Sequence, residues 1–311
     1  MVYRRKSSSS RARKPIGRTG RRGGTRRRYP TRKRTYRKNR ALPKKRILNL
    51  TSRKKRNGML TWTNTSSENG GSVTPGIGSL VVNARDGLEM IFCPHRHGSV
   101  FSSGTSTVAQ VPLRTATSCY MRGFAENIRI QSSSGIPWFH RRICFTHKGD
   151  APFRELAAGD TPVNTFSPLV ETSNGMQRLA FNLTINAQAN TRNAMKNYLF
   201  KGAQGRDWNN LIVAPVDTSR VTLKFDKTWT YRSGNANGMV KETKLFHPMN
   251  QTLVYDDDEN GDIEQDSYYS VASKAGMGDY YVMDFIQPGL GGSVTDLLAM
   301  HFNSTMYWHE R

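Results

Sequence analysis

The sequence lacks the features that mark membrane-spanning, secreted and disulfide-stapled proteins. It has no run of about 18 apolar residues, which argues against a transmembrane helix. The basic N-terminus has no apolar stretch of the kind found in a secretory signal. The three cysteines, Cys93, Cys119 and Cys144, are an odd number in a long chain and fit free thiols better than a disulfide framework. We therefore expect a protein without membrane association that is made and used in a reducing compartment.

Acidic residues are missing from the first part of the chain, where Glu68 is the first. Of the 47 Lys and Arg residues, 25 lie within residues 1–56, whereas the remaining 255 residues hold 22 basic and 23 acidic side chains. A basic enzyme or a ribosomal protein more often carries positive charge over its folded surface as well. The charge distribution predicts two domains: a polycationic arm at 1–56 and a nearly neutral folded body at 57–311.

The arm offers few aliphatic side chains for a core, and its like charges repel, so we expect it to be disordered until it meets a polyanion. Tyrosine rings stack on unpaired bases while Arg and Lys contact phosphates, and Tyr3, Tyr29 and Tyr36 lie among the arginines. This pattern predicts binding of single-stranded nucleic acid. The predicted contact residues are Arg4, Arg5, Lys6, Arg11, Arg13, Lys14, Arg18, Arg21, Arg22, Arg26, Arg27, Arg28, Tyr29, Arg32, Lys33, Arg34, Tyr36, Arg37, Lys38 and Arg40.

Two tight basic clusters stand at the body end of the arm. They consist of Lys44, Lys45 and Arg46, and of Arg53, Lys54, Lys55 and Arg56. Such clusters match the basic runs that nuclear import receptors read, but the same side chains bind nucleic acid in any case. Both interpretations stay open, and a host import receptor is an expected partner on the first.

The body is typical of an all-β fold. Residues 221–231 alternate apolar and polar side chains with a period of two, and residues 239–247 resume after a loop of Gly, Asn and Ser, which predicts a long β-hairpin. Further strands are expected at 59–63, 88–93, 108–113, 119–131, 137–146, 178–185, 253–256, 279–286 and 298–308, and short helices at 187–200 and 293–299. Many strands with almost no strand-helix alternation favour a single two-sheet antiparallel sandwich, or jelly roll.

Several motifs contain residue types that serve in metal or catalytic sites. Cys93, His95 and His97 offer metal ligands within five residues, but no second ligand pair accompanies them, so exposed imidazoles at a strand end are the simpler reading. A rolling-circle nickase would use His-x-His with a later Tyr-x-x-Lys, which 95–97 and 198–201 match formally, although Arg96 is unfavourable between metal ligands. No phosphate-binding GxxxxGK[ST] loop and no nucleophile triad spacing is present. The sequence therefore predicts no catalytic residues and no cofactor.

The acidic stretch 256–267 resembles a calcium loop in part. Oxygen ligands would come from Asp256, Asp258, Asn260 and Asp262, but Ser267 stands where a bidentate Glu is needed. We expect no metal site here, with weak divalent binding as the alternative. An exposed acidic loop that faces a neighbour's basic residues is the other interpretation.

Aromatic and cationic side chains mix in residues 138–142. Alternation along a strand sends Trp138 and Arg142 to one face and Arg141 to the other. Trp138 and Arg142 could form an inner platform on which bases stack, and the alternative is a sandwich core with a buried arginine pair.

An Arg-rich, Tyr-dotted arm on a neutral all-β body is the plan of a small-virus coat protein, and particular strings strengthen that reading. They are residues 119–123 (CYMRG), 128–131 (IRIQ), 135–145 (GIPWFHRRICF), 199–202 (LFKG), 207–208 (DW), 255–259 (YDDDE), 278–281 (GDYY) and 298–311, which ends MYWHER. Taken together they resemble the capsid proteins of genomoviruses, geminivirus-like viruses with circular single-stranded DNA. The resemblance covers essentially the whole body.

The resemblance implies a single jelly-roll domain that self-assembles into a small T=1 icosahedral shell. Basic arms would turn inward onto circular single-stranded DNA, and a host nuclear phase would make the import signals useful, so the expected locations are the virion and the host nucleus. Paired particles like those of the more distant geminiviruses are not implied. The alternatives are a nuclear nucleic-acid-condensing protein that forms no shell and, more remotely, the nickase.

Overall fold

The computed structural model describes residues 43–95, 100–101, 104–105, 110–261 and 263–310. The chain divides into two units, Met1–Lys44 and Lys45–Arg311. The predicted arm up to residue 42 lies outside the described residues. The second unit is built from β-strands, as expected, with two α-helices, α1 (Lys44–Thr51) and α2 (Ala189–Leu199), and a 3₁₀ turn, η1 (Leu183–Ile185), among the residues described.

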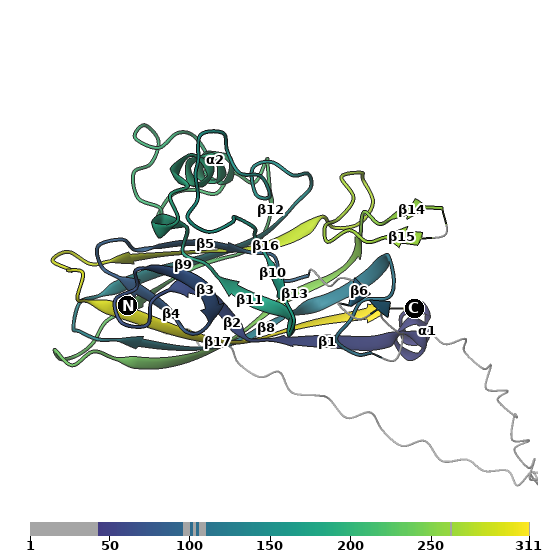
Figure 1. Ribbon diagram of the computed structural model, residues 1–311, viewed down its shortest axis with the longest axis horizontal. Helices are drawn as coiled ribbons and strands as arrows, with labels where there is room; N and C mark the ends of the chain where they lie inside the picture. Colours follow the sequence, from purple (N-terminus) through teal and green to yellow (C-terminus); the bar gives the residue numbers. More distant parts are fainter. Residues whose placement is uncertain (1–42, 96–99, 102–103, 106–109, 262, 311) are drawn as a thin grey trace, which may run out of the picture. The chain divides into compact units, whose positions relative to one another are not determined.

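Two large antiparallel sheets form the framework (Figure 1). Sheet I has the order β1-β17-β8-β13, with β4 added beside β17; its strands are β1 (Arg53–Met59), β17 (Leu297–Glu310), β8 (Ser118–Ser132), β13 (Val240–Val254) and β4 (Leu80–Asn83). Sheet II has the order β12-β9-β16-β5; its strands are β12 (Thr222–Tyr231), β9 (Trp138–His147), β16 (Asp279–Pro288) and β5 (Leu88–Phe92).

Smaller sheets complete the described strands. Sheet III has the order β10-β11-β2-β3; its strands are β10 (Val170–Thr172), β11 (Gly175–Ala180), β2 (Thr61–Thr65) and β3 (Ser72–Ile77). Two hairpins stand apart, β14 (Asp258–Asn260) with β15 (Ile263–Gln265), and β6 (Val100–Phe101) with β7 (Gly104–Thr105).

The pairing of sheets I and II follows one rule. Strands from the first half of the chain pair antiparallel with strands from the second half in reverse order: β1 with β17, β5 with β16, β8 with β13 and β9 with β12. The additional pairs β17–β8 and β16–β9 then gather these four ribbons into two sheets. The topology is that of one long hairpin folded over on itself.

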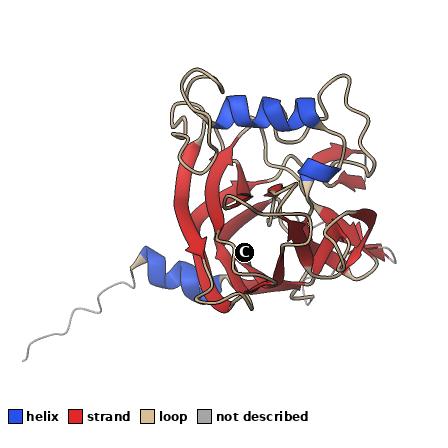
Figure 2. Ribbon diagram, turned by 90° about the vertical axis from the view of Figure 1, so that its left-hand side faces the viewer, coloured by secondary structure: helices blue, strands red, loops and turns tan. Residues whose placement is uncertain are grey.

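The two sheets differ in how they are covered. Every residue of β5 is buried and nearly every residue of β9 and β16, because sheet II faces sheet I on one side and the α2 region on the other (Figures 1 and 2). In β8 and β17 buried residues alternate with more exposed ones, the pattern of a sheet with one open face. The core between the sheets includes the fully buried rings of Phe92, Phe124 and Trp138.

Most predicted strands are confirmed, but the predicted hairpin of residues 221–231 and 239–247 is wrong. The first segment is β12, which pairs with β9 in sheet II, and the second opens β13, which pairs with β8 in sheet I. Alternation fixes which face of a strand is buried and leaves its partner open. The residues between β12 and β13 therefore cross from one sheet to the other instead of closing a turn.

Two further local predictions are wrong. The helix expected at 293–299 is a turn in which the Asp296 carboxylate accepts from the Ser293 amide at 2.7 Å, and β17 begins at once with Leu297. Residues 110–113 of the strand expected at 108–113 are a turn, and residues 108–109 lie outside the described part of the chain.

The boundary of the arm at residue 56 is also wrong. Residues 44–51 form α1 and residues 53–59 form β1, an edge strand of sheet I. The charge density of this segment predicts disorder. Alternation along β1 nevertheless turns Lys55 inward, where it pairs with the buried carboxylate of Glu310.

Candidate nucleic-acid interface

The predicted nucleic-acid contacts fall into two groups with different outcomes. The arm residues from Arg4 to Arg40, with Tyr29 and Tyr36, lie outside the described residues, so their role stays a prediction. Trp138 and Arg142 lie on β9 and are fully buried. A base cannot stack on a ring that has no exposed surface, so the predicted platform is wrong and the alternative, a core aromatic beside a buried arginine, holds.

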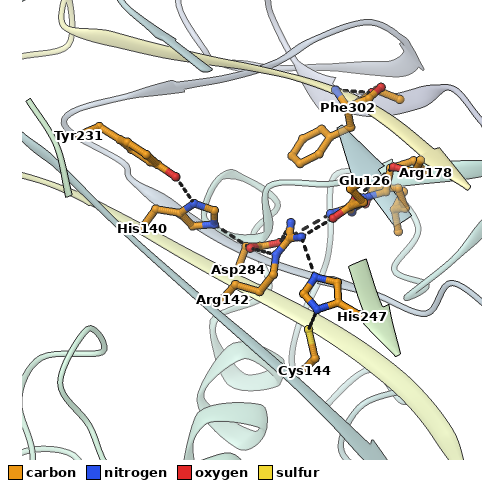
Figure 3. Close-up of polar contacts among 12 residues, drawn as sticks. Glu126, His140, Arg142, Cys144, Arg178, Tyr231, His247, Asp284 and Phe302 are labelled. Carbon is orange, nitrogen blue, oxygen red and sulfur yellow. Dashed lines mark hydrogen bonds and ion pairs between the residues drawn. The ribbon is translucent and has the colours of Figure 1, made fainter. Parts of the chain in front are cut away.

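Arg142 belongs to a charge cluster that joins the sheets (Figure 3). Its guanidinium donates to both oxygens of Asp284 on the neighbouring β16, at 2.7 and 3.0 Å, and to Glu126 of β8 in the facing sheet. Arg178 of β11 donates to the other Glu126 oxygen at 2.8 Å. Two arginines and two carboxylates therefore balance inside the core and tie together sheets I, II and III.

Polar neighbours complete the buried charge cluster. His140 contacts Asp284 through Nε2 at 2.7 Å and the Tyr231 hydroxyl through Nδ1 at 3.0 Å, and the Ser304 hydroxyl donates to Glu126 at 3.0 Å. Arg178 is held between aromatic rings, with its guanidinium carbon 4.5 Å from the centroid of Phe92 and 4.6 Å from that of Phe302. Burying charge is tolerated only with such pairing.

The pKa values of the carboxyl groups reflect this balance. Burial alone would raise the pKa of Asp284, but the charge of Arg142 and the hydrogen bond from His140 outweigh it and hold that pKa well below its usual range. Burial likewise opposes ionisation of Glu126, yet Arg142 and Arg178 lower its pKa. Both groups are ionised at neutral pH.

His247 of β13 lies at the edge of the cluster. Burial, and then the nearby charge of Arg142, lowers the pKa of His247 to about 4. Its Nε2 is 3.4 Å from the Arg142 guanidinium and its Nδ1 is 3.8 Å from the Cys144 sulfur. The imidazole is therefore neutral and packs as part of the core.

Arg141 confirms the predicted alternation along β9. It points to the opposite face of sheet II from Arg142, where it donates to both oxygens of Asp226 at 2.9 and 2.6 Å. It also donates to the carbonyls of Leu211 and Ala214. Arg141 thereby anchors the chain that follows α2 to the outer side of sheet II.

The basic clusters predicted for nuclear import are partly built into the fold. Lys44 and Lys45 belong to α1, and Arg46 is exposed there. In β1, Lys54 and Arg56 are exposed, but Lys55 is buried and donates to Glu310 at 2.9 Å and to the Leu113 carbonyl at 2.7 Å. The second cluster cannot be read as a run of four free cations in this fold, because its third member faces the core.

Hydrogen bonds hold the Glu310 carboxylate in place beside Lys55. It accepts from Trp308 at 2.7 Å and from the Thr115 hydroxyl at 2.6 Å. Burial opposes ionisation of Glu310, but these hydrogen bonds together with Lys55 lower its pKa. The pair closes the end of sheet I where β1 meets β17.

The other predicted motifs form no ligand cage in the described chain. His95 is fully buried, with Nε2 3.1 Å from the Cys93 sulfur and 3.3 Å from Asp279, so the expectation of exposed imidazoles is wrong for His95; Arg96 and His97 lie outside the described residues. The hydroxyl of Tyr198, the nucleophile of the nickase reading, contacts His147 at 2.9 Å.

The acidic stretch forms the β14–β15 hairpin instead of a loop wrapped around a cation. Asp257 is held by Arg114 through two hydrogen bonds of 2.6 and 2.9 Å, while Asp256, Asp258 and Asn260 are exposed. Asp262 lies outside the described residues. Where the structure describes the chain, no three His, Cys, Asp or Glu side chains gather as metal ligands, and no helix is long and apolar enough to cross a bilayer.

Replacing Glu126 by Gln should destabilise the folded body strongly. The change keeps the volume but leaves two buried guanidinium groups with one carboxylate, and breaking a buried ion pair costs about 3–5 kcal/mol. The free energy of unfolding, measured by urea titration, should fall by that amount. Glu242→Gln, at an exposed position, is the control and should stay within about 0.5 kcal/mol. Equal stability of the two variants would contradict a dominant role for the cluster.

Stability should fall as the pH drops from about 6.5 to 4, because the unfolded chain then protonates His247 while the folded one does not. A pKa lowered to about 4 corresponds to a loss of about 3 kcal/mol over that window. Below about pH 4 the depressed pKa values of Asp284 and Glu126 should remove further stability. Unfolding curves across this range would measure both steps. His247→Asn should flatten the first step and the exposed-site control His301→Asn should not; the reverse result would refute the assignment.

Replacing Lys55 by Ala should cost about 3 kcal/mol of folding free energy, because Glu310 would stay buried without its counter-charge. The neighbouring Lys54→Ala removes the same charge from an exposed position and should change stability by less than about 0.5 kcal/mol. Thermal unfolding of the two variants side by side makes the comparison, and a similar loss in both would show that Lys55 is not specially held.

No family model and no curated protein matches this chain. The resemblance to genomovirus capsid proteins therefore remains a prediction from the sequence strings.

Proposed function

We propose that this chain is the capsid protein of a small virus with circular single-stranded DNA, similar to the genomoviruses. In this proposal the body assembles into a T=1 icosahedral shell and the basic arm neutralises the packaged genome. The observation that carries the proposal is the combination of a folded-over hairpin of eight strands with a preceding segment, residues 1–52, that holds 21 basic and no acidic residues.

We also propose that sheets I and II form a jelly roll. Support comes from the pairing of β1 with β17, β5 with β16, β8 with β13 and β9 with β12, which is what results when one long antiparallel hairpin is rolled up. Eight-stranded double-sheet jelly rolls occur in viral capsids but also in lectins and cupins. The fold alone therefore does not select the function, and the charge of the arm has to be added.

A shell subunit has to keep its shape while neighbours press on it from several sides. The buried charge cluster supports this role, since Arg142 spans from Asp284 in sheet II to Glu126 in sheet I and restricts sliding of one sheet over the other. A protein that only condenses nucleic acid needs no body of this size. A shell, in contrast, needs extended lateral surfaces, which a folded body of this size would supply in this proposal.

Binding in this proposal is electrostatic and multivalent. Phosphate contacts release counterions, so the affinity for single strands should fall by about 0.7 log unit per log unit of salt for each phosphate neutralised. Many arms in one closed shell act together, so modest contacts suffice. Nuclear import through the exposed Arg46 region of α1 would bring the chain to the site of DNA synthesis, and no catalytic step is involved.

The proposal predicts closed particles from the purified full-length chain. Mixed with circular single-stranded DNA at low salt and imaged by negative-stain electron microscopy, it should give uniform shells whose DNA resists nuclease. Amorphous complexes that never close would favour a condensing protein and contradict the capsid assignment. Specific cutting of the circle, lost in Tyr198→Phe, would favour the nickase instead.

A further inference from the structure

The outer face of sheet I is open to solvent over four strands. Alternation turns one set of side chains of β8 and β17 into the core and the other set outward, and β1 and β13 extend the same face on either side. The outward set is called the outer face of sheet I from here on; it includes Lys54, Arg56, Tyr120, Arg122, Asn127, Arg129, Glu242, Lys244, Phe246, His301, Asn303, Tyr307 and His309.

This face is basic although the body as a whole is almost neutral. Five cationic side chains point outward here: Lys54, Arg56, Arg122, Arg129 and Lys244. Glu242, opposite Arg129 in the register, is the one acidic side chain in the outward set defined above. Arg122, Arg129 and Lys244 are three of the 22 basic side chains of residues 57–311, which also hold 23 acidic ones. Lys54 and Arg56 of β1 add two cations from the basic segment, so the face carries a positive excess.

The cations of the outer face of sheet I also lower the pKa of His309. Partial burial lowers it first, and the charges of Lys54 and Arg122 lower it further. Three strands contribute to this group, since Lys54 is on β1, His309 on β17 and Arg122 on β8. The cations therefore act on one common surface.

Aromatic rings and amides lie among the cations. Tyr120 is 40 % exposed, and its ring lies 6.0 Å from that of His309. Tyr307 precedes His309 by two positions on β17 and points to the same face. Towards the other end of the face the surface is hollowed between β8, β13 and β17, where Asn127, Arg129, Lys244, His301 and Asn303 line a shallow groove. Glu242 lines the groove as well, so two cations and one carboxylate face it, and it opens to solvent.

The length of the face suits a chain ligand. The register places His309 beside Tyr120 and His301 beside Arg129, eight residues apart along β17, which is about 27 Å at the rise of an antiparallel strand. Cations occur at both ends of this stretch, with stacking rings at one end and amides at the other. A phosphate backbone with unpaired bases requires this combination, whereas an acidic peptide would need only the charge.

We propose that the outer face of sheet I binds a segment of single-stranded nucleic acid, with phosphates on Lys54, Arg56, Arg122, Arg129 and Lys244 and bases against Tyr120 and Tyr307. The site deepens the proposed function, on which it rests, because it adds a second contact surface to that of the arm. Lys54 and Arg56 belong to β1, so the basic segment leads directly into this face along the chain. In this proposal the same single strand of nucleic acid contacts both the basic arm and the outer face of sheet I.

Photocrosslinking of the full-length chain tests this placement. Single-stranded oligothymidylate carrying 5-iododeoxyuridine should crosslink to peptides of β8 and β17 that contain Tyr120 and Tyr307, in addition to peptides of the arm. Crosslinks confined to the arm would overturn the inference and leave the proposed function standing. Absence of crosslinks and of salt-dependent binding altogether would overturn both.

A salt titration measures the contribution of the face. The triple variant Arg122→Gln, Arg129→Gln and Lys244→Gln should reduce the slope of log affinity against log salt by about 2 on circular single-stranded DNA, since about 0.7 is lost for each contact. The matched control Lys201→Gln, Arg206→Gln and Lys274→Gln removes three exposed cations from loops outside this face and should leave the slope unchanged. Equal slopes in both variants would overturn the inference, and shell formation imaged in the same samples reports separately on the proposed function.

Stacking is tested by Tyr120→Leu, which keeps an apolar side chain but removes the aromatic face. Affinity for single strands should fall about 5-fold or more, with the salt slope unchanged. A loss that appears only as a change of slope, or no loss at all, would contradict a base on Tyr120.

Discussion

The folded body depends on one cluster of buried ion pairs between arginines and carboxylates. Arg142 reaches from β9 to Asp284 beside it and to Glu126 across the core, and Arg178 brings in sheet III through the same Glu126. Because all four groups are fully buried, each charge is tolerable only while the others stay in place. These ion pairs connect sheets I, II and III and so fix the positions of the three sheets relative to one another.

Charge is distributed differently in the core and on the surface of the body. Inside the body, charge is paired and neutral; on the outer face of sheet I it is unbalanced and positive, with aromatic rings beside it. In sheet II the described residues of β5, β9 and β16 are almost all buried, with the α2 region over them. Arg141 holds the chain that follows α2 against this sheet through the carbonyls of Leu211 and Ala214. A protein built this way has one side of the sandwich free for a polyanion and the other committed to its own chain.

Periodicity predicted the strands well and their partners poorly. Residues 221–231 and 119–131 alternate as expected, because burial of one face is a local property of each strand. The partner of β12 is β9, where the ring of Trp229 packs 5.1 Å from that of His140, and alternation within residues 221–231 carries no information on that contact. Arg142 and Trp138 were misread as a nucleic-acid platform because their chemistry suits bases, whereas Glu126 and Asp284, the partners that bury Arg142, lie far away in sequence. Strict alternation within residues 118–132 would put Arg122 and Arg129 on opposite faces, because they are seven positions apart. The bulge opposite Tyr307 and Trp308 shifts the phase of the strand, so that both side chains point outward.

The pairing of β1 with β17 also has a consequence for the order of events during synthesis. Arg53 of β1 lies opposite Glu310 of β17, 257 residues later, so sheet I cannot close until almost the whole described chain has left the ribosome. Long sequence separation between contacts slows folding, and open strand edges in the meantime invite association. The basic residues ahead of β1, by contrast, leave the ribosome before the strands of the body. Their charge is therefore available to polyanions while β17, which completes the sheet that β1 begins, is still to be made.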